Sequence, residues 1–208
     1  VNELELVGSS DKVAVTVELG LIQDRGTSAR FYITKDAAPD ADNRSGGIIS
    51  PFVKVPGSDM GNWKHFVDFA KWSYRKYPAK KVLAVLWGHG SGRVDIGGAA
   101  NSGSELGIAS DDLTRNFIRN KQLALALREI ERSTGKKVSI YASDSCLMQM
   151  ASVVYEVGNS VELIVGAEEL VPGAGFPYDG ILMHLTADPG MSPAALSSVI
   201  VDDFFTYY

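Results

Sequence analysis

The sequence contains a single cysteine, Cys146, which follows a short, largely apolar stretch that ends on small polar residues. A cysteine thiolate is a strong nucleophile, and in enzymes it is commonly activated by a nearby histidine. His89 also follows an apolar stretch, earlier in the chain. A cysteine and a histidine brought together in this way would suit acyl transfer, in which the sulfur attacks a carbonyl carbon.

Both stretches have the character of strands in a parallel sheet. Residues 82–87 (VLAVLW) and 138–142 (VSIYA) are mostly apolar and lack the alternation of a half-exposed strand. This pattern is typical of strands buried on both faces. Because α/β proteins place their chemistry at the carboxyl ends of such strands, Cys146 and His89 are expected at the same edge of the sheet.

The residues after Cys146 have helical spacing. Residues 147–157 (LMQMASVVYEV) therefore predict that Cys146 lies at a helix N-terminus, where the helix dipole and free N–H groups stabilise a thiolate. Each residue alone has a more ordinary interpretation, because a lone cysteine is usually buried and inert and a lone histidine is usually a satisfied polar group. Their pairing at two strand ends favours the catalytic interpretation.

Apolar spacing also predicts the elements around these strands. An amphipathic helix is expected over residues 60–77, a second helix over 123–132, and a third beginning near Pro193. Further strands are expected over residues 11–19 and 161–167, and an edge strand over the second half of residues 23–35. Residues 93–120 lack the periodicity of a core element and are interpreted as a long loop.

Composition excludes several classes of protein. The 208 residues, of which 45% are hydrophobic, suit one domain with a sizeable core. A net charge of −5 lacks the basic excess that is typical of proteins that bind nucleic acids in general. No apolar run approaches the length of about 20 residues that a membrane span needs. One cysteine excludes an internal disulfide framework.

Three motifs together resemble the clostripain-like cysteine peptidases, which are relatives of caspases, legumains and gingipains. W-G-H-G-S-G contains His89, D-S-C-L-M contains Cys146, and G-A-E-E-L-V-P-G-A-G-F-P-Y follows. The resemblance implies a three-layer α/β/α caspase-like fold (caspase/haemoglobinase type) with a mostly parallel central sheet. It also implies that residues 1–208 form a single peptidase domain, with its first strand missing at the N-terminus and its C-terminus also incomplete.

The resemblance implies roles for individual residues. Cys146 matches the nucleophile and His89 the catalytic histidine, and the backbone N–H groups of Gly90 and Cys146 would form the oxyanion hole. Asp144 matches the acid that receives the P1 side chain, which implies an endopeptidase that cuts after Arg or Lys. The ordinary alternative for Asp144 is a capping residue of the following helix.

The chain departs from the family where the P-G-A-G turn lacks an aspartate. Glu168, Glu169 or Asp179 could substitute for it, which leaves the choice between Arg and Lys open. In the family, a loop between the histidine and the cysteine is cut after a basic residue to activate the enzyme. The candidates for self-cleavage here are Arg115, Arg119 and Lys121, and a plain surface loop is the alternative.

The chemistry expected of this family needs no cofactor. Some members require calcium, but residues 36–44 (DAAPDADNR) lack the EF-hand spacing and are interpreted as a solvated loop. No metal site is therefore predicted, and calcium stays open. The expected partners are a peptide or protein substrate with a basic P1 residue and a complementary chain or segment of the same precursor, with no nucleic acid or membrane. The resemblance implies a bacterial enzyme that is secreted or held in the cell envelope.

Two other function classes fit part of the sequence. A catalytically silent caspase-like module that binds a peptide or partner would keep the fold and the acidic residue, but it leaves the presence of both catalytic residues unexplained. A nucleotide-binding domain could use the glycines after Trp87. However, G-H-G-S-G has neither the Lys-Ser/Thr of a P-loop nor the G-x-G-x-x-G spacing.

Overall fold

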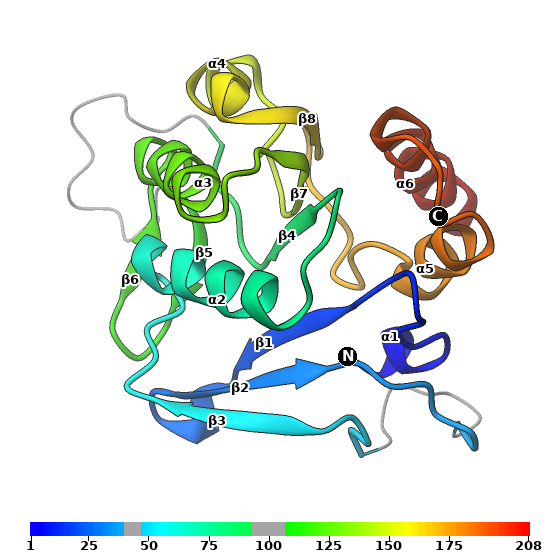
Figure 1. The fold of residues 1–208 in the computed structure, drawn as a ribbon. Coiled ribbons are helices and arrows are strands. Elements are labelled where there is room, and N and C mark those ends of the chain that lie inside the picture. Colours follow the sequence, from blue (N-terminus) through cyan, green and yellow to red (C-terminus); the bar gives the residue numbers. More distant parts are fainter. Residues whose placement is uncertain (40–46, 93–106) are drawn as a thin grey trace. The chain divides into compact units, whose positions relative to one another are not determined.

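The computed structural model of the chain describes residues 1–39, 47–92 and 107–208 (Figure 1). They fall into two compact units. Unit 1 comprises Val1–Ser58 and Phe176–Tyr208, and unit 2 comprises Asp59–Gly175. Cys146 and His89 both belong to unit 2. In the described part of the chain no helix is long and apolar enough to cross a membrane.

Unit 2 is built on a parallel sheet, as the sequence predicts. Its strands are β4 (Leu83–Trp87), β7 (Val138–Asp144) and β8 (Val161–Val165), in the order β4-β7-β8. Every residue of β7 is buried, which explains why this stretch does not alternate between apolar and charged residues. All three strands run in the same direction, so the residues that follow β4 and β7 leave the sheet at one edge.

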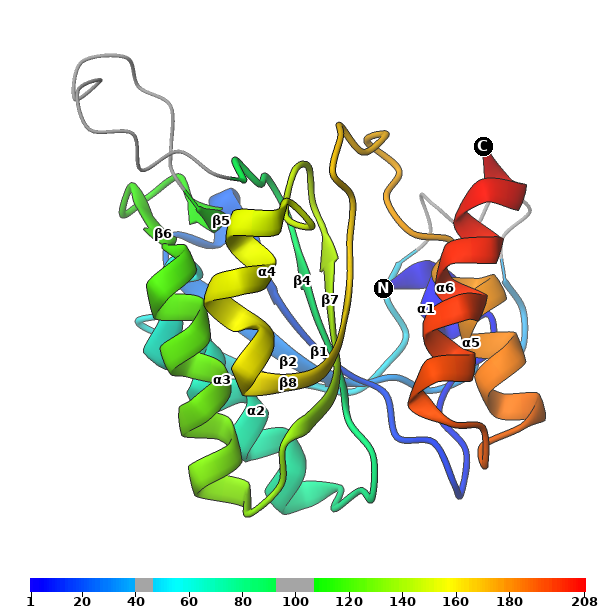
Figure 2. The same cartoon turned by 90° about the horizontal axis from the view of Figure 1, so that it is seen from above.

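Three helices cover one face of this sheet (Figures 1 and 2). They are α2 (Trp63–Lys76), α3 (Asn120–Thr134) and α4 (Ala151–Val157), with a short 3₁₀ turn, η2 (Gly158–Ser160), after α4. The expected stripe of α2 is confirmed, because Val67 lies in the core and Trp63, Phe66 and Ala70 pack against it. α3 ends at Gly135 in the left-handed conformation, which caps the helix.

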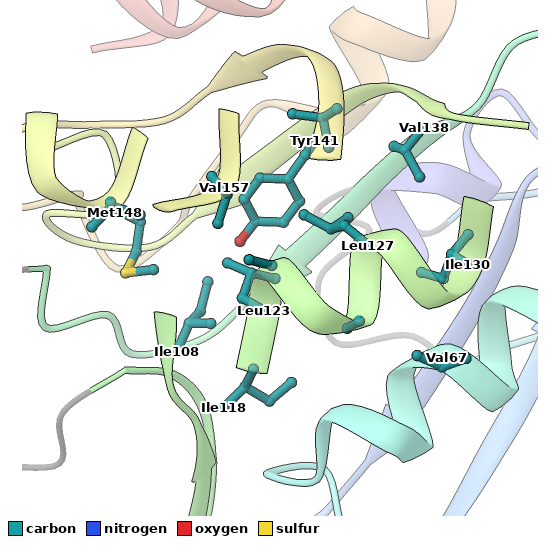
Figure 3. Packing of buried hydrophobic residues seen from close by; sticks show 14 residues of the cluster. Val67, Ile108, Ile118, Leu123, Leu127, Ile130, Val138, Tyr141, Met148 and Val157 are labelled. Atoms are coloured by element: carbon teal, nitrogen blue, oxygen red, sulfur yellow. The ribbon is translucent and has the colours of Figure 1, made fainter. Parts of the chain in front are cut away.

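Tyr141 of β7 lies at the centre of the core of unit 2 (Figure 3). Leu123 and Leu127 of α3 and Val157 of α4 lie around its ring. Its hydroxyl accepts a hydrogen bond of 2.8 Å from Ser143 Oγ. Burial raises the pKa of Tyr141, so the phenol stays neutral and the core holds no charge at this point.

The segment before α3 is not a plain loop, which corrects the expectation for residues 93–120. Residues 93–106 lie outside the described part, but β5 (Ile108–Asp111) and β6 (Asn116–Ile118) form an antiparallel hairpin, and α3 already begins at Asn120. Ile108 and Ile118 are register partners and are buried. Strands of three and four residues are too short to produce a recognisable alternation, so they could not be recognised from the sequence.

Unit 1 contains an antiparallel sheet of β1 (Thr16–Gly20), β2 (Thr27–Tyr32) and β3 (Phe52–Pro56), in the order β1-β2-β3. β2 is therefore the middle strand, and its expected position at an edge is wrong. The error arose because β3 was not recognised: its apolar residues Phe52 and Val53 are exposed, and prolines flank them. The 3₁₀ turn η1 (Ile22–Asp24) lies between β1 and β2.

The helices of unit 1 are α1 (Asn2–Glu5), α5 (Tyr178–Ala187) and α6 (Pro193–Tyr207). The predicted start of α6 is confirmed: the Ser192 side chain accepts a hydrogen bond from the Ala195 N–H, and Pro193 occupies the first turn. Glu5 joins α1 to the segment before β3. Its buried carboxylate accepts hydrogen bonds from the N–H groups of Ile49 and Ser50.

Candidate active site

His89 follows β4 in an exposed loop that begins with a glycine turn. β4 ends at Trp87, and Gly88 has a φ of 146°, a conformation that side-chain-bearing residues rarely adopt. The Gly88 N–H donates to the carbonyl of Asp144, so the two strand ends are still hydrogen-bonded where the loop leaves the sheet. The imidazole is exposed, as a group that exchanges protons with a substrate must be.

Cys146 follows β7 in a tight turn and not at a helix N-terminus, so that expectation is wrong. β7 continues to Asp144, and α4 begins only at Ala151. Leu147 has a left-handed φ of 64°, which interrupts any helix at this point. The backbone N–H groups of Leu147 and Gln149 donate instead to the carbonyls of Glu169 and Ala167, in the segment after β8. Helical spacing alone could not reveal that these donors pair with a distant segment.

The turn that carries Cys146 is anchored on both sides. Met148, two residues after the cysteine, is completely buried in the core of unit 2. The sulfur itself accepts a hydrogen bond of 3.3 Å from the N–H of Val171. Val171 was not singled out by the sequence, because a backbone donor leaves no signature in the residue type. The thiol is half-buried and held by main chain from the segment after β8.

Gly90 brings the histidine loop onto the cysteine turn. A Cβ placed at Gly90 would overlap the carbonyl oxygen of Cys146 and the side chains of Ser145 and Met148. Only glycine permits this approach, because any larger residue would push the two loops apart. The sequence prediction that the loops after β4 and β7 meet is therefore confirmed. An oxyanion hole made by the N–H groups of Gly90 and Cys146 stays a prediction that agrees with this proximity.

The histidine loop is also held from the side of the hairpin. Gly90 forms an isolated β-bridge with Ile108, and the Ser91 N–H donates to the carbonyl of Gly107 at 3.0 Å. Asn120, the first residue of α3, donates from Nδ2 to the carbonyl of Gly92 at 3.0 Å. Sequence reasoning missed Ser91 and Asn120. Their partners are backbone atoms of residues distant in the chain, so residue type gave no signal beyond polarity.

Asp144 is the last residue of β7 and is only 2% exposed. Its carboxylate lies against Gly175, which has a φ of 73° and where an added Cβ would overlap the carboxylate oxygens. The ordinary alternative, that Asp144 caps the following helix, is wrong because α4 starts seven residues later and Met150 occupies its N-cap. A buried carboxyl group two residues from the thiol is an environment that can receive a cationic ligand group.

No contact that the structure describes joins Asp144 to the other acidic candidates for P1 binding. Glu168 and Glu169 are exposed, and Glu169 takes part through its backbone carbonyl, which accepts from Leu147. Asp179 belongs to unit 1, in the first turn of α5, where it lines a surface pocket with Leu6, Lys35 and Met183 among others. The contribution of these three residues to P1 binding stays a prediction.

The three candidates for self-cleavage lie in different local structures. Arg115 is exposed in the turn of the β5–β6 hairpin and has a left-handed φ of 57°. Arg119 is exposed at the N-cap of α3, and its N–H donates to the side chain of Gln122. Lys121 is exposed but already helical. Among the described residues no group of three His, Cys, Asp or Glu side chains could hold a metal ion.

Comparison with known proteins agrees with this geometry. A sequence profile described as the clostripain family matches residues 45–208. Clostripain from Hathewaya histolytica is 30% identical over 135 residues, which cover 61% of this chain and 24% of clostripain.

Solved structures share the fold of the whole chain. A secreted C11 cysteine protease from Bacteroides thetaiotaomicron, in complex with an irreversible peptide inhibitor, is 18% identical with a TM-score of 0.73. An inactive zymogen C11 protease from Parabacteroides distasonis is 18% identical with a TM-score of 0.66. Each similarity covers 100% of this chain and about half of the solved protein, 52% and 51% respectively. The expected caspase-like α/β fold is thereby confirmed.

Proposed function

Because this chain belongs to the clostripain family, we propose that it carries the nucleophile and the histidine of a cysteine endopeptidase that cuts peptide bonds after Arg or Lys. One observation carries the proposal. Gly90 packs directly on the Cys146 carbonyl, so the loop of the histidine and the turn of the only cysteine meet at the edge of a parallel sheet. The chain spans about a quarter of clostripain, so the activity of the whole protein is part of the proposal.

In the proposed mechanism the Cys146 thiolate attacks the carbonyl carbon after the basic residue. Backbone N–H groups of Gly90 and Cys146 stabilise the negative charge that develops on the carbonyl oxygen. The protonated His89 donates its proton to the leaving amine, which departs and leaves a thioester on Cys146. His89 then removes a proton from a water molecule, and the hydroxide attacks the thioester. The acid product leaves, and the thiolate and the protonated imidazole are restored.

Specificity for a basic P1 residue would come from Asp144. A carboxylate that is 2% exposed has lost most of its hydration, and a cationic substrate group compensates for that loss. A neutral P1 side chain would leave the charge without this compensation. The inhibitor-bound relative from Bacteroides thetaiotaomicron supports a peptide as the ligand class.

The decisive experiment uses fluorogenic peptides that end in Arg, Lys, Ala or Asp. We expect the wild-type protein to cut the Arg or Lys peptides, and Cys146→Ala and His89→Ala to lose at least about 1,000-fold in kcat/KM. Asp144→Asn should lower kcat/KM for basic peptides by about 100-fold, while Asp112→Asn, at an exposed position of the hairpin, should leave it unchanged. Cleavage that survives in Cys146→Ala would refute the proposed nucleophile.

The competing function is a module that binds a peptide or partner without cutting it. Because Cys146 is the only cysteine, the rate at which iodoacetamide labels the protein reports on this thiol alone. An activated nucleophile should react much faster than free cysteine at pH 6, since only a thiolate reacts. Labelling as slow as that of free cysteine, together with no cleavage of any of the four peptides by a folded protein, would favour the binding module.

We further propose that the peptidase is activated by self-cleavage in residues 107–121. Arg115 is the favoured site, because it is exposed in a hairpin turn, whereas cleavage at Lys121 would require the start of α3 to unwind. The zymogen described for the Parabacteroides distasonis relative supports a requirement for activation. Purified Cys146→Ala protein should stay intact and Arg115→Gln should be cut slowly or at Arg119. Processing of Cys146→Ala during incubation would exclude self-cleavage.

The proposed chemistry uses no cofactor, and activity should survive removal of divalent ions with a chelator. A loss of activity that calcium restores would instead show a calcium requirement. The secreted relative supports a proposal that this protein, too, acts outside the cytoplasm. Its substrate would then be an extracellular peptide or protein with accessible basic residues.

A further inference from the structure

Trp87, the last residue of β4, is 61% exposed although it adjoins the proposed site. The four preceding residues of β4 are all partly buried. Trp87 lies two residues before His89, so its position relative to the catalytic loop is set by the rigid end of a strand. A large aromatic side chain at such a position is available to a ligand that binds at this edge of the sheet.

The register of the sheet places Trp87 beside Asp144. Trp87 pairs with Asp144 and Leu86 pairs with Ser143 in adjacent parallel strands, which lie about 4.8 Å apart. Paired residues point to the same face of a sheet, and successive residues of a strand point to opposite faces. Leu86 packs against the core that contains Tyr141, so Trp87 and Asp144 share the face turned away from that core.

The neighbour of the indole on this face is therefore a buried carboxylate. Asp144 is 2% exposed and is covered by the backbone of Gly175. A cation that approached this carboxylate along the face of the sheet would also pass the indole ring. Aromatic rings attract cations over their faces, and tryptophan does so more strongly than tyrosine or phenylalanine.

We infer that the indole of Trp87 forms one wall of the S1 pocket, which receives the P1 side chain, and makes the enzyme prefer Arg to Lys. The inference rests on the proposed peptidase function and names the residue that decides between the two basic side chains. The guanidinium is planar and weakly hydrated, so it can stack on the indole while its N–H groups point at Asp144. The ammonium of lysine is a compact and strongly hydrated charge that gains less from the ring.

The kinetic test compares peptides that differ only at P1, which is Arg, Lys or the neutral arginine analogue citrulline. We expect Trp87→Ala to lower kcat/KM for the Arg peptide by about 10- to 30-fold and for the Lys peptide by less than about 3-fold. Trp87→Phe should fall between Trp87→Ala and wild type. The citrulline peptide should be cut poorly by every variant, because it has no charge to offer Asp144.

A matched control separates the effect of the indole from a general effect of removing an aromatic side chain. Tyr155 on α4 is 86% exposed and belongs to the same unit, so Tyr155→Ala should leave the Arg-to-Lys ratio unchanged. A ratio that stays the same in Trp87→Ala, or an equal loss with Arg and Lys peptides, would overturn the inference. Cleavage that still depends on Cys146 would in that case leave the peptidase proposal intact.

A binding measurement distinguishes a failure of the Trp87 inference from a failure of the peptidase proposal. Peptides that end in Arg or Lys are titrated calorimetrically into the Cys146→Ala protein, with and without Trp87→Ala. Preferential binding of the Arg peptide that disappears with Trp87→Ala would support the inference even if the wild-type protein cut nothing, in which case only the peptidase proposal fails. If neither peptide bound and neither was cut, both proposals would be wrong.

Discussion

The two loops that meet at the candidate active site are positioned in different ways. The turn after β7, residues 145–150, carries Cys146 and is fastened by main-chain hydrogen bonds to the segment after β8. The loop after β4, residues 88–92, carries His89; Ser91 bonds it to Gly107, just before β5, and Asn120 of α3 donates to its Gly92 carbonyl. The two loops touch where Gly90 packs on Cys146.

This difference indicates which of the two loops is more sensitive to substitutions elsewhere in the chain. The cysteine turn depends on backbone atoms of the segment after β8 and on Met148 in the core, so few side-chain substitutions outside the core can move it. The histidine loop depends on side chains and on the β5–β6 hairpin, which also contains the favoured site of self-cleavage. We therefore expect the loss of contacts between this loop and residues 107–120 to act on His89 more than on Cys146.

The largest effect should come from forcing the two loops apart. Gly90→Ala places a Cβ into the Cys146 carbonyl and the Ser145 side chain, and the strain can be relieved only by separating the loops. We expect kcat/KM to fall by at least about 100-fold. The control is Gly158→Ala, where an added Cβ meets nothing within 4 Å and φ is helical. Equal activities of the two variants would contradict the close approach.

A smaller effect should come from removing a side chain that holds the histidine loop. Asn120→Ala loses the hydrogen bond from Nδ2 to the Gly92 carbonyl, so His89 should sample unproductive positions. We expect kcat to fall by about 10-fold with little change in KM. Asn116→Ala, whose exposed side chain contacts Asp59 instead, serves as the control. A rise in KM at unchanged kcat would show that the loop positions substrate and not the histidine.

The smallest effect concerns stability and depends on pH. Partial burial opposes ionisation of Asp111 at the end of β5. The N–H groups of Thr114, Met60 and Leu113 donate to its carboxylate, outweigh this burial and lower its pKa. Because the folded pKa is the lower one, ionised Asp111 stabilises the fold above its ordinary pKa near 3.8. That contribution is lost as the pH falls through the folded value.

Asp111→Ala should therefore lower the Tm by about 2 to 4 °C at pH 7, and the difference from wild type should shrink below pH 4. The exposed neighbour Asp112 provides the control, since Asp112→Ala should leave the Tm nearly unchanged at both pH values. A difference in Tm that stayed constant down to pH 2.5 would mean that the charge of Asp111 does not anchor the hairpin. The hairpin would then be anchored by its other contacts, such as the buried Ile108 and Ile118.

Much of unit 2 could be predicted because its signals are local. The buried strands β4, β7 and β8, the apolar stripe of α2 and the glycine that ends α3 each follow from a run of neighbouring residues. The hairpin β5–β6 and strand β3 could not be predicted in this way. Their strands are short or exposed, and pairing with another strand, which no local pattern records, is what makes them strands.

The sequence by itself predicted the chemistry, because Cys146 and His89 each follow a strand of one parallel sheet and such strands share an edge. Only the tertiary structure decided how that chemistry is held. It replaced the expected helix at Cys146 with a turn bonded to the segment after β8, and it set Gly90 against that turn. It also placed Trp87 beside the buried Asp144. These features join residues far apart in the chain, and residue order does not encode hydrogen bonds between backbone atoms or the register of two strands.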